Sequence, residues 1–276
     1  MNRLSRSWGL FKTSLSVLKQ DKELLWMPVL SVLASILTIM AIAGVGFALT
    51  PALFIDGAFD VIGAVLALAT YLLLAFVTLF FNAAVVAAAN ERLGGGDPTV
   101  KSALAAAWAR KGRLFAWAAV IATVNLILQA LRERAGFLGQ IMAGIAGFAW
   151  NLATFFVVPT LLFTEKSLGD SVKGSAGLFK QTWGETVVGE AGIGFVSGLL
   201  GIAIGITGFI GTLALATVLG TIGLIVGIVT TVVAILALAA LSSVLAGIYK
   251  AALYRWATGG NTGSFDQQTL ASAFHP

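Results

Sequence analysis

The sequence contains no cysteine and only one histidine, His275, which lies one residue from the C-terminus. The lack of cysteine excludes disulfides, thiolate nucleophiles and cysteine-ligated metal or iron–sulfur sites. A single histidine cannot build a histidine-based triad or a multi-histidine metal site within one chain. The glycine-rich turn at Gly94–Asp97 is not followed by Gly-Lys-Ser or Gly-Lys-Thr, so it is not a phosphate-binding loop. We therefore expect a protein that is not an enzyme and that has no catalytic residues, no metal and no cofactor.

Charged residues are also scarce, at 11% of the chain against about 25% in typical soluble proteins. From Ala191 to Tyr249 the chain runs 59 residues without Asp, Glu, Lys, Arg or His. A helix rises about 1.5 Å per residue and a bilayer's hydrocarbon core is about 30 Å thick, so this run can cross a membrane twice. Together with 58% hydrophobic residues and a mean hydropathy of +0.96, it predicts an all-α integral membrane protein.

Six hydrophobic segments are long enough to span a bilayer as helices. They cover approximately residues 24–49, 61–90, 114–131, 137–163, 191–213 and 221–249. Only a short stretch separates the last two, and we expect their turn at Ala216–Gly220. The sequence thus predicts a polytopic helical membrane protein with a single membrane domain over residues 1–258. Its six transmembrane helices form three hairpins, and residues 259–276 form a short polar tail.

The basic residues are unevenly distributed among the connections. Fifteen of the 17 Lys and Arg residues lie before the first segment, in the second and fourth connections, or after the last segment. The other two, Arg132 and Arg134, lie in the third connection. Because Lys and Arg accumulate on the cytoplasmic side, both termini are predicted to be cytoplasmic. Since these charges gather at segment ends, the net charge of +5 indicates contact with membrane lipids rather than with nucleic acid.

Each predicted hairpin is preceded by a segment with helical apolar spacing, which indicates an amphipathic helix on the cytoplasmic membrane surface. The first carries its apolar side chains at Leu4, Trp8, Phe11, Leu15 and Leu18. In the second, we expect Asp97 to cap the helix and Pro98 to lie in its first turn. The third follows Gly169, with an apolar face at Val172, Ala176, Phe179 and Trp183. The expected interfacial anchors are Trp8, Lys12, Trp108, Lys180 and Trp183.

No predicted span has an ionisable residue near its middle, so proton relays and carboxylate ion sites lose the residues they need. The polar groups that remain are amides and hydroxyls, among them Asn82, Asn125, Gln129, Asn151 and Thr154. Asn125 and Gln129 are four residues apart and therefore share a helix face. These side chains either line a hydrated path or bind a polar headgroup, or they form interhelical hydrogen bonds worth about 0.6 kcal/mol each. Both interpretations remain open.

Proline and glycine mark two further features of the spans. Pro159 removes a backbone donor and predicts a helix kink, which either forms a gate or merely shapes the bundle. Glycines four residues apart create flat faces on the last two helices, at Gly194 and Gly198, Gly201 and Gly205, and Gly223 and Gly227. Such faces allow close helix packing, either within one chain or across a homo-oligomer interface.

Two parts of the chain carry a family resemblance. One is the stretch from Asp21 to Ser31, preceded by Ser7-Trp8 and Leu18. The other consists of Phe265-Asp266, Leu270 and Ala273-Phe274. The sequence resembles an uncharacterised family of prokaryotic polytopic membrane proteins, a domain of unknown function. The resemblance implies a multi-pass protein of a prokaryotic plasma membrane with six spans, and it carries over no catalytic or binding residues.

Two classes of function fit these patterns. The first is an oligomeric, non-enzymatic membrane protein that provides a permeation or lipid-handling path for a small solute, ion or lipid. The second is a scaffold whose amphipathic helices shape the cytoplasmic leaflet or dock a partner protein, which the sequence does not identify.

Overall fold

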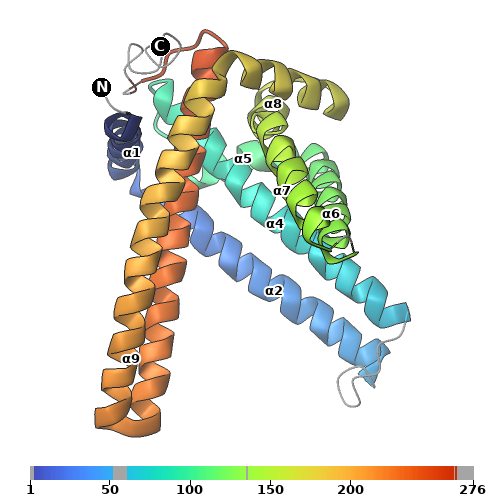
Figure 1. The fold of residues 1–276 in the computed structure, drawn as a ribbon. Helices are drawn as coiled ribbons and strands as arrows, with labels where there is room; N and C mark the ends of the chain where they lie inside the picture. Colours follow the sequence, from blue (N-terminus) through green and yellow to red (C-terminus); the bar gives the residue numbers. More distant parts are fainter. Residues whose placement is uncertain (1–2, 52–60, 135, 264, 266–276) are drawn as a thin grey trace.

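The computed structural model describes residues 3–51, 61–134, 136–263 and 265, with the backbone alone for residues 3–11 and for most of 181–195. Within these residues the regular secondary structure is entirely helical (Figure 1). The elements are α1 (Arg3–Gln20), η1 (Lys22–Leu25), α2 (Trp26–Leu49), α4 (Val61–Leu93), α5 (Val100–Ala109), α6 (Lys111–Arg134), α7 (Gly136–Ala153), α8 (Val157–Phe163) and α9 (Leu168–Ala257).

Five helical stretches of the described chain are long and apolar enough to cross a membrane. They are Lys22–Leu49, Val61–Leu93, Lys111–Arg134, Gly136–Phe163 and Val196–Ala257. The fifth contains Gly220, whose φ of 58° and ψ of −136° are not helical, and the chain reverses there into two antiparallel limbs (Figure 1). The structure confirms the all-α polytopic membrane fold, and the reversal falls at the end of the predicted turn.

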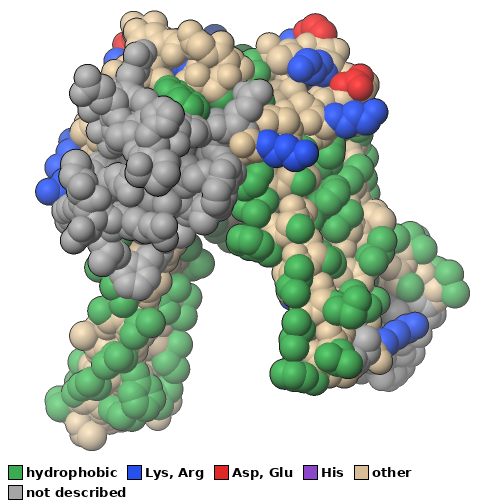
Figure 2. All heavy atoms as spheres, turned by 45° about the horizontal axis from the view of Figure 1, so that its top comes forward, with side chains coloured by type: hydrophobic (Ala, Val, Ile, Leu, Met, Phe, Trp, Pro, Cys, Tyr) green, Lys and Arg blue, Asp and Glu red, His purple; other side chains and the backbone are tan. Residues whose placement is uncertain are grey.

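The helices converge at one end of the molecule, which we call the polar end. It is formed by α1, α5, α8 and the first and last turns of α9, so the described part of the chain begins and ends there (Figure 1). Figure 2 shows Lys, Arg, Asp and Glu side chains gathered on this end, whereas the helices leading away from it carry mostly hydrophobic side chains. Away from the polar end, the two long limbs of α9 diverge from α2 and α4 (Figure 1).

The buried core lies where the helices converge. Its members include Ala83–Ala89 of α4, Phe156 and Leu161 near α8, and Leu245, Ile248 and Leu253 of α9. A Cβ atom added at Gly247 would lie 2.6 Å from Val85 Cγ1, so only glycine permits this crossing of α9 over α4. Farther out, large side chains such as Val218 and Ile222 are exposed, as lipid-facing residues of a membrane helix would be.

The two limbs of the α9 hairpin pack through small residues in a regular register. Ser242 Oγ donates to Ser197 Oγ at 2.7 Å near the base of the hairpin. An added Cβ at Gly227 would lie 2.6 Å from Thr212 Cα, and one at Gly208 would lie 2.4 Å from Thr231 Oγ1. These pairs, and Gly201 against Leu238 and Gly223 against Leu215, step evenly away from the reversal at Gly220.

The cap predicted for the second amphipathic helix is wrong. Thr99, not Asp97, caps α5: its backbone is extended, its hydroxyl accepts the N–H of Ser102 at 3.0 Å, and Ser102 Oγ accepts the Thr99 N–H. Pro98 therefore precedes the helix. Asp97 instead accepts a hydrogen bond from Arg92 at 2.7 Å. The same guanidinium also pairs with the buried carboxylate of Asp21, which ties the start of η1 to the end of α4.

The C-terminal segment also contacts the core. Phe265 is buried, and its carbonyl accepts a hydrogen bond from Thr262 Oγ1 at 2.9 Å. Gly263 approaches Leu93 so closely that an added Cβ would lie 3.1 Å from Leu93 Cδ2. The start of the predicted polar tail therefore docks on the end of α4. Residues 266–276, including Leu270 and Phe274, lie outside the described residues.

Candidate functional site

The span predicted over residues 137–163 is broken into two helices. Helix α7 ends at Ala153 and α8 begins at Val157, with a turn between them in which the Val157 N–H donates to Thr154 O at 3.1 Å. Pro159 is the third residue of α8, in the first turn, where a missing backbone donor needs no partner. The kink attributed to Pro159 thus becomes a complete interruption, which lies just ahead of the proline.

A side chain from the polar end stabilises this break. The N–H of Phe156 donates to Ser175 Oγ at 2.9 Å, and both residues are fully buried. Ser175 belongs to the first part of α9, the segment predicted as the third amphipathic helix. One backbone group released by the interruption is therefore satisfied by a neighbouring helix, as membrane proteins require where a span is broken.

A cavity of about 410 Å³, which we call the amide cavity, lies beside the break. Its polar lining consists of Asn82 from α4, Asn125 from α6, Asn151 from the end of α7, Thr154 from the turn that follows α7, and Lys250 from α9. Aromatic side chains complete the wall, namely Trp117, Phe148, Trp150 and Phe155. Three of the four polar-path residues predicted from the sequence are thus brought together. The fourth, Gln129, does not line the cavity and donates to Glu133 Oε1 at 2.9 Å instead.

The cavity lies within the apolar length of the helices. Asn125 is fourteen residues from the start of α6, about 21 Å along the helix axis at 1.5 Å per residue. Asn82 is eleven residues from the end of α4, or about 16 Å. Each polar lining residue also falls inside one of the stretches able to cross a membrane. These polar groups therefore lie at a depth where bulk water does not reach lipid-facing surfaces.

The three amides have no hydrogen-bond partner within the described part of the chain. Neither Asn82, Asn125 nor Asn151 makes a side-chain hydrogen bond there, so the interhelical hydrogen bonds considered from the sequence are not formed. Trp117 is only 2% exposed, and its indole N–H likewise has no partner among the described residues. An amide in an apolar environment without a hydrogen bond costs roughly 2–7 kcal/mol. The cavity thus requires water or a polar ligand as partner.

Two contacts that the sequence did not indicate shape the cavity. The ammonium of Lys250 lies 4.6 Å from the centre of the Phe155 ring, a cation–π geometry. The rings of Trp117 and Trp150 are stacked with centroids 5.8 Å apart. From the sequence, Lys250 marked only the end of the last span. In the structure α9 continues to Ala257, so Lys250 lies inside the helix. A longer prediction for the last span would therefore have included Lys250 among the candidate site residues.

The comparisons with known proteins give one family. The model of a family of unknown function, DUF6159, matches residues 61–265, which is most of the chain. This chain belongs to that family. The match contains every residue that lines the amide cavity, and it confirms the resemblance to an uncharacterised family of membrane proteins. Comparisons with curated proteins and with solved structures found no match.

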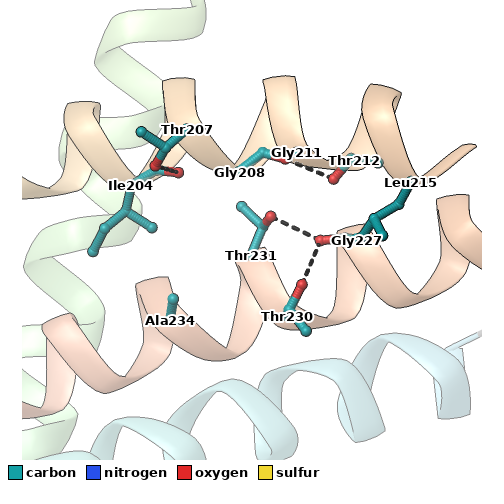
Figure 3. Close-up of a pocket in the computed structure, with 10 residues that line it drawn as sticks. All are labelled: Ile204, Thr207, Gly208, Gly211, Thr212, Leu215, Gly227, Thr230, Thr231 and Ala234. Atoms are coloured by element: carbon teal, nitrogen blue, oxygen red, sulfur yellow. Dashed lines mark hydrogen bonds between the residues drawn. The ribbon is translucent and has the colours of Figure 1, made fainter.

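A second pocket of this DUF6159 member, about 330 Å³, lies between the limbs of α9 (Figure 3). Its threonine hydroxyls already have partners: Thr212 donates to Gly208 O at 2.7 Å and Thr231 to Gly227 O at 2.8 Å. Thr230 also donates to Gly227 O, at 3.0 Å (Figure 3). The pocket is therefore lined by methyl groups and glycine backbone. It has fewer free hydrogen-bonding groups for a polar ligand than the amide cavity has.

The glycine faces predicted from the sequence divide into two groups. Gly201, Gly223 and Gly227 face the opposite limb of the hairpin, where a Cβ would contact or overlap it. Gly194, Gly198 and Gly205 have no atom within 4 Å of an added Cβ. Packing within the chain therefore accounts for the first group. Homo-oligomer contact through the second group stays a prediction.

The predicted interfacial anchors are less fully described. Trp108 is exposed at 59%, and Lys111 Nζ lies 4.0 Å from the centre of its ring. Lys12 and Lys180 are exposed on α1 and on the first part of α9. The side chains of Trp8 and Trp183 lie outside the described residues.

Proposed function

We propose that this protein is a non-enzymatic, oligomeric integral membrane protein that binds the polar part of a small solute or lipid in the amide cavity and provides a path for it. In this proposal the chain crosses a prokaryotic plasma membrane six times, as three hairpins. Both termini and the polar end lie in the cytoplasm. The count of six follows from the five membrane-length stretches if the reversal at Gly220 divides the last one into two crossings. The orientation follows from the fifteen basic residues outside Arg132 and Arg134.

The observation that carries the proposal is the convergence, in one cavity at membrane depth, of three amides that have no hydrogen-bond partner among the described residues. A polar site that only joined helices would pair its amides with one another. Here Asn125 and Asn151 are exposed at the protein surface, so a molecule in the membrane can reach them without opening the core. An amide both donates and accepts, which suits hydroxyl, ester or phosphate groups of a lipid as well as water.

A first experiment tests whether the cavity is hydrated. The chain has no cysteine, so each single-cysteine variant has one reactive thiol. Asn125→Cys should react with a water-soluble maleimide in reconstituted vesicles. Ile127→Cys lies on the same helix and is 62% exposed, so it serves as the lipid-facing control and should react much more slowly. Equal and negligible labelling of both variants would contradict a water-accessible cavity.

A second experiment tests transport. Vesicles containing a fluorescent phospholipid in one leaflet and a small trapped dye report lipid movement and solute leakage separately. We expect the wild-type protein to accelerate either the lipid movement or the solute leakage. Asn125→Leu should slow it about tenfold, because a hydrogen-bonding group worth about 1.4 kcal/mol is lost. Gln129→Leu, an amide on the same helix outside the cavity, is the matched control. Tight vesicles without lipid movement would contradict the proposal and favour the scaffold hypothesis.

A further inference from the structure

A third cavity, about 300 Å³, lies at the polar end and shares no lining residue with the amide cavity. We call it the threonine cavity, because Thr160 and Thr164 of the α8 segment and Thr258 at the end of α9 line it. Thr164 and Thr258 are the C-cap residues of α8 and α9. The cavity therefore lies where two helices of the membrane domain end, at the depth where lipid headgroups lie.

Two unpartnered hydrogen-bond donors line this cavity. Lys166 has an exposed side chain that makes no ion pair or hydrogen bond with the described residues, and its Nζ would lie 3.6 Å from a Cβ added at Gly174. Tyr254 is 92% buried, since only 8% of its surface is exposed, and its hydroxyl has no partner in the described part of the chain. The ammonium of Lys166 and the hydroxyl of Tyr254 can both donate a hydrogen bond to an oxyanion, and the ammonium also supplies a positive charge.

The threonines supply acceptors rather than donors. Thr160 donates its hydroxyl proton to Phe156 O at 2.8 Å, Thr164 to Thr160 O at 2.7 Å and Thr258 to Tyr254 O at 2.8 Å. Each hydroxyl oxygen keeps lone pairs that can accept a hydrogen bond from a ligand. The cavity thus has a donor side at Lys166 and Tyr254 and an acceptor side at the three threonines.

The charges around the cavity suit an anion. No carboxylate of the described residues lines it, and the nearby Glu165 pairs with Arg110 and Arg113. A helix C-terminus repels anions through its free carbonyl groups. In α8 that repulsion is offset, because Arg113 donates to Leu161 O at 3.1 Å and to Thr164 O at 2.6 Å. Lys166 therefore adds a positive charge to an already compensated helix end.

The geometry points to a binding site for a lipid headgroup that carries a phosphate and a further hydrogen-bond donor. The phosphate would accept from Lys166 and Tyr254, and a headgroup hydroxyl or ammonium would donate to the threonine oxygens. Phosphatidylglycerol has both groups. Phosphatidylcholine has the phosphate but no donor, so the site should discriminate between the two.

The test uses the purified full-length protein in detergent, titrated with short-chain phosphatidylglycerol or phosphatidylcholine and followed by native mass spectrometry. We expect phosphatidylglycerol to bind about tenfold more tightly. Lys166→Gln and Tyr254→Phe should each weaken it about tenfold, because each variant removes a charge-assisted hydrogen bond to the phosphate. Both variants remove groups without internal partners, so both should fold. Lys173→Gln, an exposed lysine near the start of α9 that does not line the cavity, should bind as the wild type does.

Three results would overturn this inference: equal affinity for the two lipids, unchanged binding by Lys166→Gln and Tyr254→Phe, or an equal loss in Lys173→Gln, which would indicate general surface charge. Inorganic phosphate is added in a separate arm. If it displaces the lipid, the phosphate group alone suffices as ligand. If phosphate does not displace the lipid, the site recognises the whole headgroup. Neither result depends on the amide cavity, so the proposed function and this inference fail independently.

Discussion

At the scale of single residues, three equally buried serines have different roles. Ser14, Ser171 and Ser175 are all fully buried. Ser175 accepts the N–H of Phe156, whereas Ser14 Oγ and Ser171 Oγ have no partner among the described residues. Burial alone therefore does not identify a polar group that stabilises the fold. The partner decides, because a buried donor left without an acceptor costs about 1–3 kcal/mol.

Replacing Ser175 with alanine should destabilise the protein. The N–H of Phe156 would stay buried without a partner, and we expect a loss of about 1–3 kcal/mol in the free energy of unfolding. Ser171→Ala is the matched control, since it removes a hydroxyl that already lacks a partner and should be neutral or stabilising. Thermal unfolding in detergent measures both. A loss in Ser171→Ala as large as in Ser175→Ala would show that size, rather than the hydrogen bond, matters here.

Residue patterns in the sequence predicted part of the candidate site. Asn125, Asn151 and Thr154 stand out as polar residues in apolar helices, and they do line one cavity. Lys250 and Trp117 did not stand out, because a lysine near a helix end and a tryptophan near an interface are ordinary in membrane proteins. Their place in the cavity depends on how α6 and α9 each pack against α4, which no local spacing encodes.

At the scale of elements, helix length is predictable and helix interruption is not. Bilayer thickness sets the length of an apolar run, so most helix ends lie within a few residues of their predicted positions. The break at residues 154–156 depends on Pro159 together with the distant Ser175, which supplies the acceptor that makes the interruption stable. The first part of α9 was likewise predicted as a separate surface helix, but it runs on into the membrane-length limb without a break in its hydrogen bonding.

The α9 hairpin should depend on only some of its glycines. Gly227→Val places a side chain where Thr212 Cα lies 2.6 Å from the added Cβ, so the limbs must separate. Gly205→Val adds the same side chain where nothing lies within 4 Å. Cysteines replacing Ser197 and Ser242, whose oxygens are 2.7 Å apart, should form a disulfide across the limbs.

We expect Gly227→Val to reduce formation of that disulfide several-fold and Gly205→Val to leave it unchanged. The yield is read from gel mobility after mild oxidation. If Gly205→Val were the more disruptive change, the outward face of the hairpin would be packed against another chain, and the intramolecular register described here would not be the dominant constraint.

At the scale of the whole molecule, the distribution of charged side chains follows the arrangement of the helices. Most of the ionisable side chains in view gather at the polar end, where the helices converge, and the two limbs of α9 extend away from it with apolar surfaces (Figure 2). The hydropathy of the sequence predicted this separation of charged and apolar surfaces, because the separation is a property averaged over many residues. The divergence of the limbs from α2 was not predictable, since it depends on which helix faces are small enough for close approach.

The two ends of the molecule should lie on opposite sides of the membrane. In the cysteine-free chain, Lys101→Cys places a thiol on α5 at the polar end, and Arg134→Cys places one at the last residue of α6. A maleimide that cannot cross membranes should label Arg134→Cys in intact cells and Lys101→Cys only after permeabilisation. Labelling of both without permeabilisation would contradict the proposed orientation.

The paired spacing of small residues across Gly220 also limits how the length of this chain can change during evolution. One residue inserted between Gly208 and Gly220 would rotate everything before it by about 100° relative to the opposite limb. Larger side chains, such as Ile202 in place of Gly201, would then occupy glycine positions that face the opposite limb. Insertions and deletions in this hairpin should therefore be tolerated only as matched pairs, one in each limb, so a gap in one limb of an aligned relative should be accompanied by a gap in the other.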